Sequence, residues 1–263
     1  MAPPLTIAVA QQKGGVGKTT TTANLAHAGS RAGARVLAID LDPQGNLTRT
    51  LYDQEIPEGQ PITADVLTED GPVPLADVIV STAWSGLDLA PTVDRDLAAV
   101  ERDLTQNPRT PTRVKLLHEA IQASEVAASY DVVLIDCPPN IGALTLAALA
   151  AADRVLAVTE PTLFSADALV EIEESVARVR QHYQVPVTLS AVLVNKWRSN
   201  VIEDRHWRLS LAEQFGDLVL DPPVPQRVII SRAIQAGVSL SQMGADAKPI
   251  AELYDRHYRT LTA

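Results

Sequence analysis

The stretch Gln11-Gln12-Lys13-Gly14-Gly15-Val16-Gly17-Lys18-Thr19-Thr20 decides how the rest of the chain is interpreted. It follows an apolar run over residues 5–10 and precedes a helical pattern over residues 22–31, an order typical of strand, loop and helix. Glycines let the backbone turn its N–H groups toward an anion and take positive φ at little cost. The helix that follows adds its positive N-terminal end. The stretch therefore predicts a phosphate-binding loop.

Two side chains of this loop specify a nucleoside triphosphate. Lys18 supplies a positive charge for the outer phosphates, and the Thr19 hydroxyl is placed to coordinate Mg²⁺. We therefore predict that ATP and Mg²⁺ are the cofactors. The predicted nucleotide-binding residues of the loop are Gly14, Gly15, Val16, Gly17, Lys18, Thr19 and Thr20.

The loop departs from the general pattern G-x-x-x-x-G-K-[ST] at its first position, where the chain has Gln12, and a second lysine, Lys13, stands beside it. The form KGGVGKTT resembles the deviant Walker A motif of the ParA/MinD group of ATPases. In that group the extra lysine reaches across a dimer interface to the partner's nucleotide, so the resemblance implies a catalytic role for Lys13 beside Lys18. The alternative interpretation of Lys13 is a solvated loop lysine, which the intact motif around it disfavours.

A second acidic segment follows a buried-looking strand at residues 34–39, with the sequence Asp40-Leu41-Asp42-Pro43-Gln44-Gly45-Asn46. Ligands bind at the carboxyl ends of parallel strands, where this segment lies. It resembles the DxDPQGN segment of the same family. The resemblance implies that Asp42 orients or deprotonates the attacking water and that Asp40 helps to hold the metal shell. The Pro-Gln-Gly sequence by itself also suits an ordinary turn.

The clearest strand is the apolar run at residues 130–136, which ends in Asp136. Asp136 matches the Walker B position, which holds Mg²⁺ directly or through water. The predicted metal site therefore comprises Thr19, Asp40 and Asp136. The continuation Cys137-Pro138-Pro139 resembles the family's IDCPP signature, although Asn140 stands where relatives carry Ser. Cys137 is interpreted as a small packed residue.

Strands and helices alternate through the rest of the chain. Right-handed crossovers between β-branched strands predict an α/β fold with a doubly wound, mainly parallel sheet flanked by helices, in which residues 1–263 form one domain. Residues 53–82, rich in Pro, Gly and acids, are predicted to be a surface excursion. Asn195, at the end of a predicted strand, and Pro225 match positions where relatives contact adenine. An Asn after a strand is also a common turn former.

Composition restricts the classes of function. The chain has 22 Lys plus Arg and 32 Asp plus Glu, a formal charge of −10, so DNA binding requires a local basic patch. The single cysteine excludes a disulfide framework and the cysteine pair that an iron–sulfur carrier needs, and it favours a reducing cytoplasm. No apolar run is long enough to span a bilayer. The first predicted strand begins close to Met1, so we expect neither a signal peptide nor an N-terminal helix-turn-helix extension. We therefore expect no operator-specific repression by this chain alone.

Five arginines are candidate contacts to DNA phosphates: Arg198, Arg205 and Arg208, spaced as on one helical face, and Arg227 and Arg232. Acidic residues lie nearby, so a solvated surface of mixed charge explains any single one of them equally well. Near Arg232 the chain also lacks the Glu-Ala-Pro stretch that relatives usually carry.

The motifs KGGVGKTT, DLDPQGN, YDVVLIDCPP, VLVNK and VPQRV together resemble ParA-type partition ATPases along nearly the whole chain. The resemblance implies an ATPase that is slow until stimulated, an ATP-dependent homodimer, non-specific binding to DNA and a ParB-type centromere-binding partner. The expected location is the cytoplasm, on the nucleoid when ATP is bound. Two alternatives remain: a relative that positions a non-DNA cargo, and a MinD-like ATPase at the membrane. The latter needs a basic amphipathic C-terminal helix, and residues 251–263 carry only two arginines.

Overall fold

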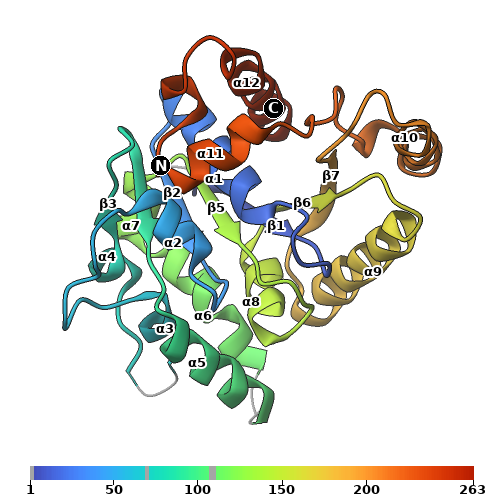
Figure 1. The fold of residues 1–263 in the computed structure, drawn as a ribbon. Helices are drawn as coiled ribbons and strands as arrows, with labels where there is room; N and C mark the ends of the chain where they lie inside the picture. The colour runs from blue at the N-terminus through green and yellow to red at the C-terminus, as the bar shows by residue number, and fades with distance from the viewer. Residues whose placement is uncertain (1–2, 69–70, 107–110) are drawn as a thin grey trace.

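A computed structural model describes residues 3–68, 71–106 and 111–263. Within them lies one seven-stranded sheet in the order β3-β4-β2-β5-β1-β6-β7 (Figure 1). All neighbouring strands are parallel except β3, which pairs antiparallel with β4 at the edge. The strands are β1 (Leu5–Ala10), β2 (Val36–Asp40), β3 (Val80–Ser81), β4 (Leu87–Ala90), β5 (Val132–Asp136), β6 (Arg154–Thr159) and β7 (Thr188–Val194).

Helices cover both faces of this sheet, so the predicted doubly wound α/β fold is confirmed. The helices are α1 (Lys18–Arg31), α2 (Asn46–Leu51), α3 (Thr63–Val66), α4 (Leu75–Val78), α5 (Asp94–Gln106), α6 (Pro111–Gln122), α7 (Ser124–Ser129), α8 (Ala143–Ala151), α9 (Ser165–Tyr183), α10 (Ile202–Phe215), α11 (Val228–Gln235) and α12 (Lys248–Thr262). Two 3₁₀ turns, Gly216–Leu218 and Leu240–Gln242, complete the set.

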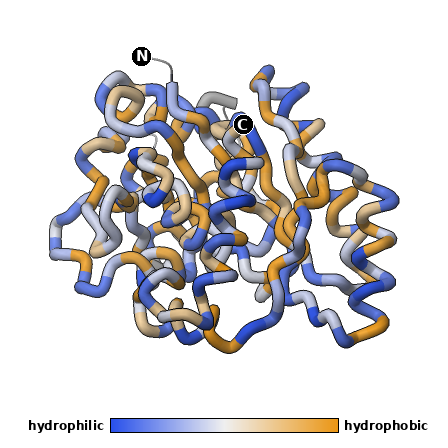
Figure 2. The backbone as a smooth tube through the Cα atoms, turned by 90° about the horizontal axis from the view of Figure 1, so that it is seen from above, coloured by the Kyte–Doolittle hydropathy of each residue, from blue (hydrophilic) through white to orange (hydrophobic). Residues whose placement is uncertain are grey.

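Alternation along the strands divides the apolar core into two layers. In β1, Ile7 and Val9 join a cluster with residues of α1, α2, α11 and α12, whereas Ala8 and Ala10 join a cluster on the opposite face with residues of α3 to α10. Successive side chains of a strand point to opposite faces, and a strand covered on both sides is apolar at every position. The backbone seen from above in Figure 2 shows these apolar strands within more polar surroundings.

The stretch 53–82, for which the sequence predicts a surface excursion, supplies α3, α4 and the edge strand β3. Four of its apolar side chains, those of Val66, Leu67, Leu75 and Val78, are buried in the core that α5 to α9 cover. Burial of a Leu or Val side chain contributes roughly 1.5–3 kcal/mol, so these residues hold the excursion against the sheet. Its residues 69–70 lie outside the described part of the chain.

Helix α12 is held in place through its apolar side. The side chains of Tyr254, Tyr258 and Leu261 are buried in the layer that also contains α1. His257 is buried on the same helix, and its Nε2 lies 3.0 Å from the carbonyl oxygen of Pro222. A carbonyl only accepts, so Nε2 carries the proton of a neutral ring and donates it. No helix in the described residues has the length and apolar character that a membrane span requires.

The buried ring of His257 predicts a loss of stability in mild acid. Burial lowers the pKa of His257 to about 4. A folded-state pKa below the unfolded value of about 6.5 means that its contribution is complete above pH 6.5 and is lost as the pH falls toward 4. At pH 5 this loss is about 2 kcal/mol. We expect His257→Gln, which keeps a donor for Pro222, to flatten the fall in unfolding free energy between pH 7.5 and pH 5.

The measurement is urea unfolding at a series of pH values, with His206→Gln as the matched control. His206 is exposed on α10, so its removal is expected to leave the pH dependence unchanged. Parallel pH profiles for wild type and His257→Gln would contradict the assignment.

Candidate functional site

The loop between β1 and α1 has the backbone that its glycines predict. Gly15 and Gly17 take φ values of 78° and 96°, in the left-handed region that side chains disfavour. A Cβ on Gly17 would also lie 2.2 Å from Nδ2 of Asn195, so only glycine fits this close approach. The loop ends directly at the N-terminus of α1, where the helix dipole favours an anion.

Thr19 and Asp136 meet beside this loop. The Thr19 hydroxyl donates to Oδ2 of Asp136 at 2.7 Å, and the Thr22 hydroxyl lies 3.2 Å from Oδ1 of the same carboxylate. Asp136 is fully buried, and burial, reinforced by the nearby charge of Asp40, raises its pKa above the ordinary value. Lys18 is also buried, and burial lowers its pKa while Asp136 opposes that effect.

Asp40 and Asp42 belong to the turn that follows β2. Asp40 lies opposite Asp136 in the pairing of β2 with β5. Its carboxylate accepts hydrogen bonds from the backbone N–H and the hydroxyl of Thr48, both at 2.7 Å, and it is fully buried. Asp40 therefore anchors α2. The Asp42 carboxylate accepts from the backbone N–H of Gln44 at 3.0 Å and lines the pocket described next.

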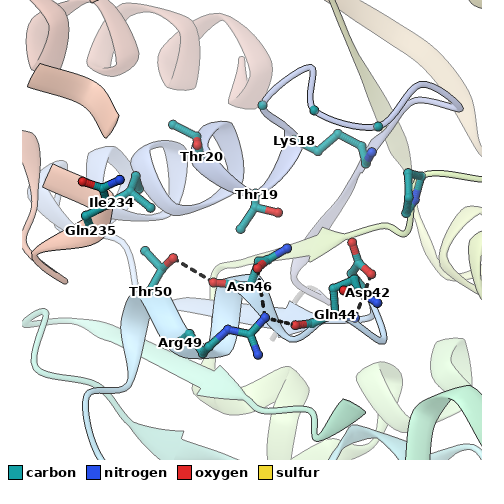
Figure 3. Close-up of a pocket in the computed structure, with 14 residues that line it drawn as sticks. Lys18, Thr19, Thr20, Asp42, Gln44, Asn46, Arg49, Thr50, Ile234 and Gln235 are labelled. Atoms are coloured by element: carbon teal, nitrogen blue, oxygen red, sulfur yellow. Dashed lines mark hydrogen bonds between the residues drawn. The ribbon is translucent and has the colours of Figure 1, made fainter. Parts of the chain in front are cut away.

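A pocket of about 600 Å³ lies over the loop (Figure 3). Its size is within the range usual for small-molecule sites. In Figure 3, Lys18 and Asp42 lie at one end of the pocket, and Ile234 and Gln235 of α11 lie at the other. The lining residues are Gly14, Gly15, Gly17, Lys18, Thr19, Thr20, Asp42, Gln44, Asn46, Arg49, Thr50, Pro139, Ile234 and Gln235.

The donor set fits a magnesium nucleotide. The Asp136 carboxylate is close to the carboxylates of Asp40 and Asp42 and to Lys18, which is the one buried lysine among the described residues. A divalent cation would offset this excess of acidic groups. The described residues contain no group of three or more His, Cys, Asp or Glu side chains arranged to hold a metal alone. Mg²⁺ characteristically uses one or two protein oxygens and completes its shell with phosphate oxygens and water, so Thr19 and Asp136 would suffice as its protein ligands.

Some lining residues were not predicted from the sequence. Gln44 and Asn46 belong to the acidic segment quoted above, in which the motif implies roles only for the carboxylates. Arg49 and Thr50 lie on α2, a short helix without an apolar repeat. Ile234 and Gln235 come from α11, far along the chain, and nothing local in the sequence relates them to the loop.

Six of the predicted nucleotide- and metal-site residues lie outside the pocket lining, namely Lys13, Val16, Asp40, Asp136, Asn195 and Pro225. Lys13 is exposed, and within the described residues it makes no hydrogen bond or ion pair. Asn195 is buried and donates through Nδ2 to the carbonyl oxygen of Val16 at 2.7 Å. Pro225 pairs with Trp197 in an isolated bridge next to the end of β7.

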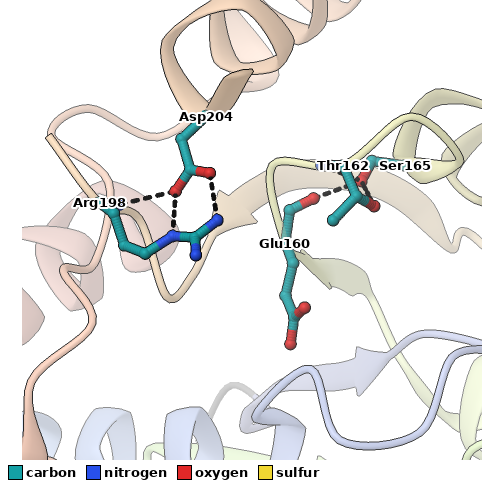
Figure 4. A network of polar contacts seen from close by, with 5 residues as sticks. All are labelled: Glu160, Thr162, Ser165, Arg198 and Asp204. Carbon is teal, nitrogen blue, oxygen red and sulfur yellow. Dashed lines mark hydrogen bonds and ion pairs between the residues drawn. The ribbon is translucent and has the colours of Figure 1, made fainter. Parts of the chain in front are cut away.

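The candidate arginines divide into two groups. Arg198 forms a two-pronged ion pair with Asp204 (Figure 4), with contacts of 3.0 and 2.7 Å, and Arg208 pairs with Asp221. Arg198 also precedes α10, which begins at Ile202. The predicted sharing of one helical face by Arg198, Arg205 and Arg208 is therefore wrong for Arg198, because the chain turns before the helix begins.

The remaining three candidates are exposed. Arg205 donates through Nε to the carbonyl oxygen of Ser199 at 2.8 Å. Arg227 and Arg232, at the start and in the last turn of α11, have no hydrogen bond or ion pair with any residue that the structure describes.

Comparison with known proteins relates this geometry to a family. The model of the AAA domain family matches residues 5–189. The chain is 37% identical over 232 residues to the chromosome partitioning protein ParA of Caulobacter vibrioides, covering 88% of this chain and 84% of that protein. It is 33% identical to the sporulation initiation inhibitor protein Soj of Bacillus subtilis, covering 88% of each.

A solved structure matches over nearly the whole length. The protein named cobyrinic acid a,c-diamide synthase from Mycobacterium smegmatis, with bound ATP analogue and magnesium, is 31% identical with a TM-score of 0.78, covering 97% of this chain and 93% of that one. The order of motifs, the parallel sheet and these relatives agree, and the chain belongs to the ParA/Soj family of partition ATPases.

Proposed function

We propose that this protein is a ParA-type segregation ATPase, in which Mg·ATP joins two copies that bind DNA without sequence preference until a ParB-type partner stimulates hydrolysis. The observation that carries the proposal is that α11 reaches both the pocket and the protein surface. This helix supplies Ile234 and Gln235 to the pocket over the phosphate loop. Arg227 directly before it and Arg232 in its last turn are exposed and make no hydrogen bond or ion pair with the residues that the structure describes.

The pocket supports binding and hydrolysis of ATP. Lys18 and the loop N–H groups would bind the phosphates, and Thr19 with Asp136 would hold Mg²⁺, which neutralises charge on the phosphate oxygens when bound. Asp42 lies at the Lys18 end of the pocket, where its carboxylate would orient the attacking water and accept its proton. Catalysis of this kind depends on positioning and charge, so turnover is slow until every charge-stabilising group is present. Pro225 remains a predicted adenine contact, whereas both ends of the Asn195 side-chain amide are already engaged, by the carbonyl oxygen of Val16 and by the N–H of Lys196.

Exposed groups near the loop support a second copy as the missing part of the site. Lys13 is exposed at the loop and does not line the pocket of its own chain. Leu163 and Phe164, on the loop after β6, are 55% and 69% exposed. Large apolar side chains in solvent are a common mark of an interaction surface. A two-fold dimer would cover them and bring each Lys13 to the partner's triphosphate.

The first test asks whether Lys13 acts between subunits. Asp42→Ala slows hydrolysis, so with ATP we expect a stable dimer. Adding Lys13→Ala removes the charge that bridges to the partner's triphosphate, and we expect a return to monomer. Size-exclusion chromatography with light scattering measures both. Lys248→Ala in the Asp42→Ala background is the control, since Lys248 is exposed on α12. A dimer that persists without Lys13 would contradict the role between subunits.

The second test concerns DNA. Replacing Arg227 and Arg232 with Ala in the ATP-bound Asp42→Ala protein is expected to lower affinity for non-specific duplex DNA roughly tenfold or more. Each lost phosphate contact reduces the slope of log K against log salt by about 0.9, so the slope falls by about 2. Fluorescence anisotropy over a salt series measures both quantities.

The control for the DNA test removes two other exposed arginines, Arg102 on α5 and Arg180 on α9, which belong to helices on the opposite face of the sheet. This control changes the net charge by the same amount as the replacement of Arg227 and Arg232. We expect its slope of log K against log salt to stay near that of the Asp42→Ala protein. Equal losses in the two double variants would mean that overall charge, and not α11, governs binding.

The packing of α12 supports the expectation that this protein does not bind membranes. A MinD-like anchor requires a free apolar helix face, whereas the apolar side chains of α12, including Tyr254 and Tyr258, are buried in the core. A relative that positions a protein cargo would share the ATP-dependent dimer and DNA binding. The partner that stimulates hydrolysis distinguishes that alternative from DNA partition.

A further inference from the structure

Two consecutive residues at the end of β7 contact two consecutive carbonyl groups of the phosphate loop. Nδ2 of Asn195 donates to the carbonyl oxygen of Val16 at 2.7 Å, and Nζ of Lys196 donates to the carbonyl oxygen of Gly15. Neither side chain lines the pocket. These two residues, here named the β7 clamp, therefore bind the loop from outside the pocket.

The local backbone is arranged for this contact. The N–H of Asn195 donates to the carbonyl oxygen of Thr159 at 2.7 Å, which fixes the end of β7 against β6. Lys196 has φ of 54°, a left-handed conformation that costs a non-glycine residue about 1 kcal/mol or more. Its N–H donates to Oδ1 of Asn195 at 2.9 Å, so the clamp residues also support each other.

Glu160 completes the clamp. Its carboxylate lies 2.9 Å from Nζ of Lys196, which places the ammonium between Glu160 and the loop carbonyl. The Glu160 backbone is fixed in turn, because its carbonyl oxygen accepts from the N–H of Thr162 at 2.9 Å and from the hydroxyl of Ser165. Figure 4 shows the Glu160 carboxylate extending away from Thr162 and Ser165.

We propose that Asn195 and Lys196 are positioning residues that hold the phosphate loop in its anion-binding shape. In a planar trans peptide the C=O and N–H groups point in opposite directions. Holding the carbonyls of Gly15 and Val16 outward therefore holds the N–H groups of Val16 and Gly17 toward the pocket. A cation on the Gly15 carbonyl also polarises its peptide unit and makes the Val16 N–H a stronger donor to phosphate. This role rests on the proposed nucleotide site.

The test has an arm that needs no nucleotide. Hydrogen–deuterium exchange of the loop peptide, residues 11–20, is measured in the free protein for wild type, Lys196→Ala, Lys196→Arg and Asn195→Ala. We expect at least fivefold faster exchange in both alanine variants and near-wild-type exchange in Lys196→Arg, which keeps a charged donor. Lys248→Ala is the matched control and should leave the exchange of the loop peptide unchanged. Unchanged exchange in Lys196→Ala and Asn195→Ala would overturn the proposal.

The second arm measures displacement of a fluorescent ATP analogue by ATP and by inorganic triphosphate. Loss of the clamp is expected to weaken both competitors by the same factor, roughly five- to twentyfold, with recovery in Lys196→Arg. A loss confined to ATP would instead assign the end of β7 to the base and overturn the proposal. Wild-type protein that binds neither competitor would refute the proposed ATPase function, while the exchange arm would still test the clamp.

Discussion

The burial of the Asp136 carboxylate at the end of β5 is the constraint on which the site depends. A buried carboxylate is costly unless hydrogen bonds or a cation compensate it, and the Thr19 hydroxyl at 2.7 Å supplies only part of that compensation. The neighbouring Asp40 adds negative charge, and it is already engaged by Thr48 of α2. The protein's own groups thus compensate the Asp136 carboxylate only in part. Binding Mg²⁺ there would relieve repulsion that the fold itself has created.

The second constraint is on the backbone of the phosphate loop. A glycine-rich loop is free to adopt many conformations, and freedom of this kind costs entropy whenever an anion must order it. The ends of β6 and β7 reduce that freedom through Asn195, Lys196 and Glu160. These contacts join residues from the second half of the chain to a loop near its start. The parallel sheet brings the carboxyl ends of these strands to one edge.

Much of this arrangement follows from local sequence. The continuous apolar runs of β1 and β5 and the glycine loop predict strands, loop and helix, because burial on both faces and positive φ restrict the residue types strongly. The short helix α2 was not predicted, since it is set by the contact of Thr48 with Asp40 and not by an apolar repeat. The position of Lys196 and the approach of α11 to the pocket were also beyond prediction, because both depend on contacts between residues far apart in sequence.

The position of α11 gives a physical route from the nucleotide pocket to the surface. Ile234 and Gln235 line the pocket, and Arg232 is exposed in the same turn of helix. A helix is stiff over so short a distance, so a ligand that moves its pocket side must also move its exposed side. The chain as a whole carries a formal charge of −10 and is repelled by DNA. DNA binding, as proposed, would therefore depend on how a few arginines are presented, and a small displacement of α11 would suffice to regulate it.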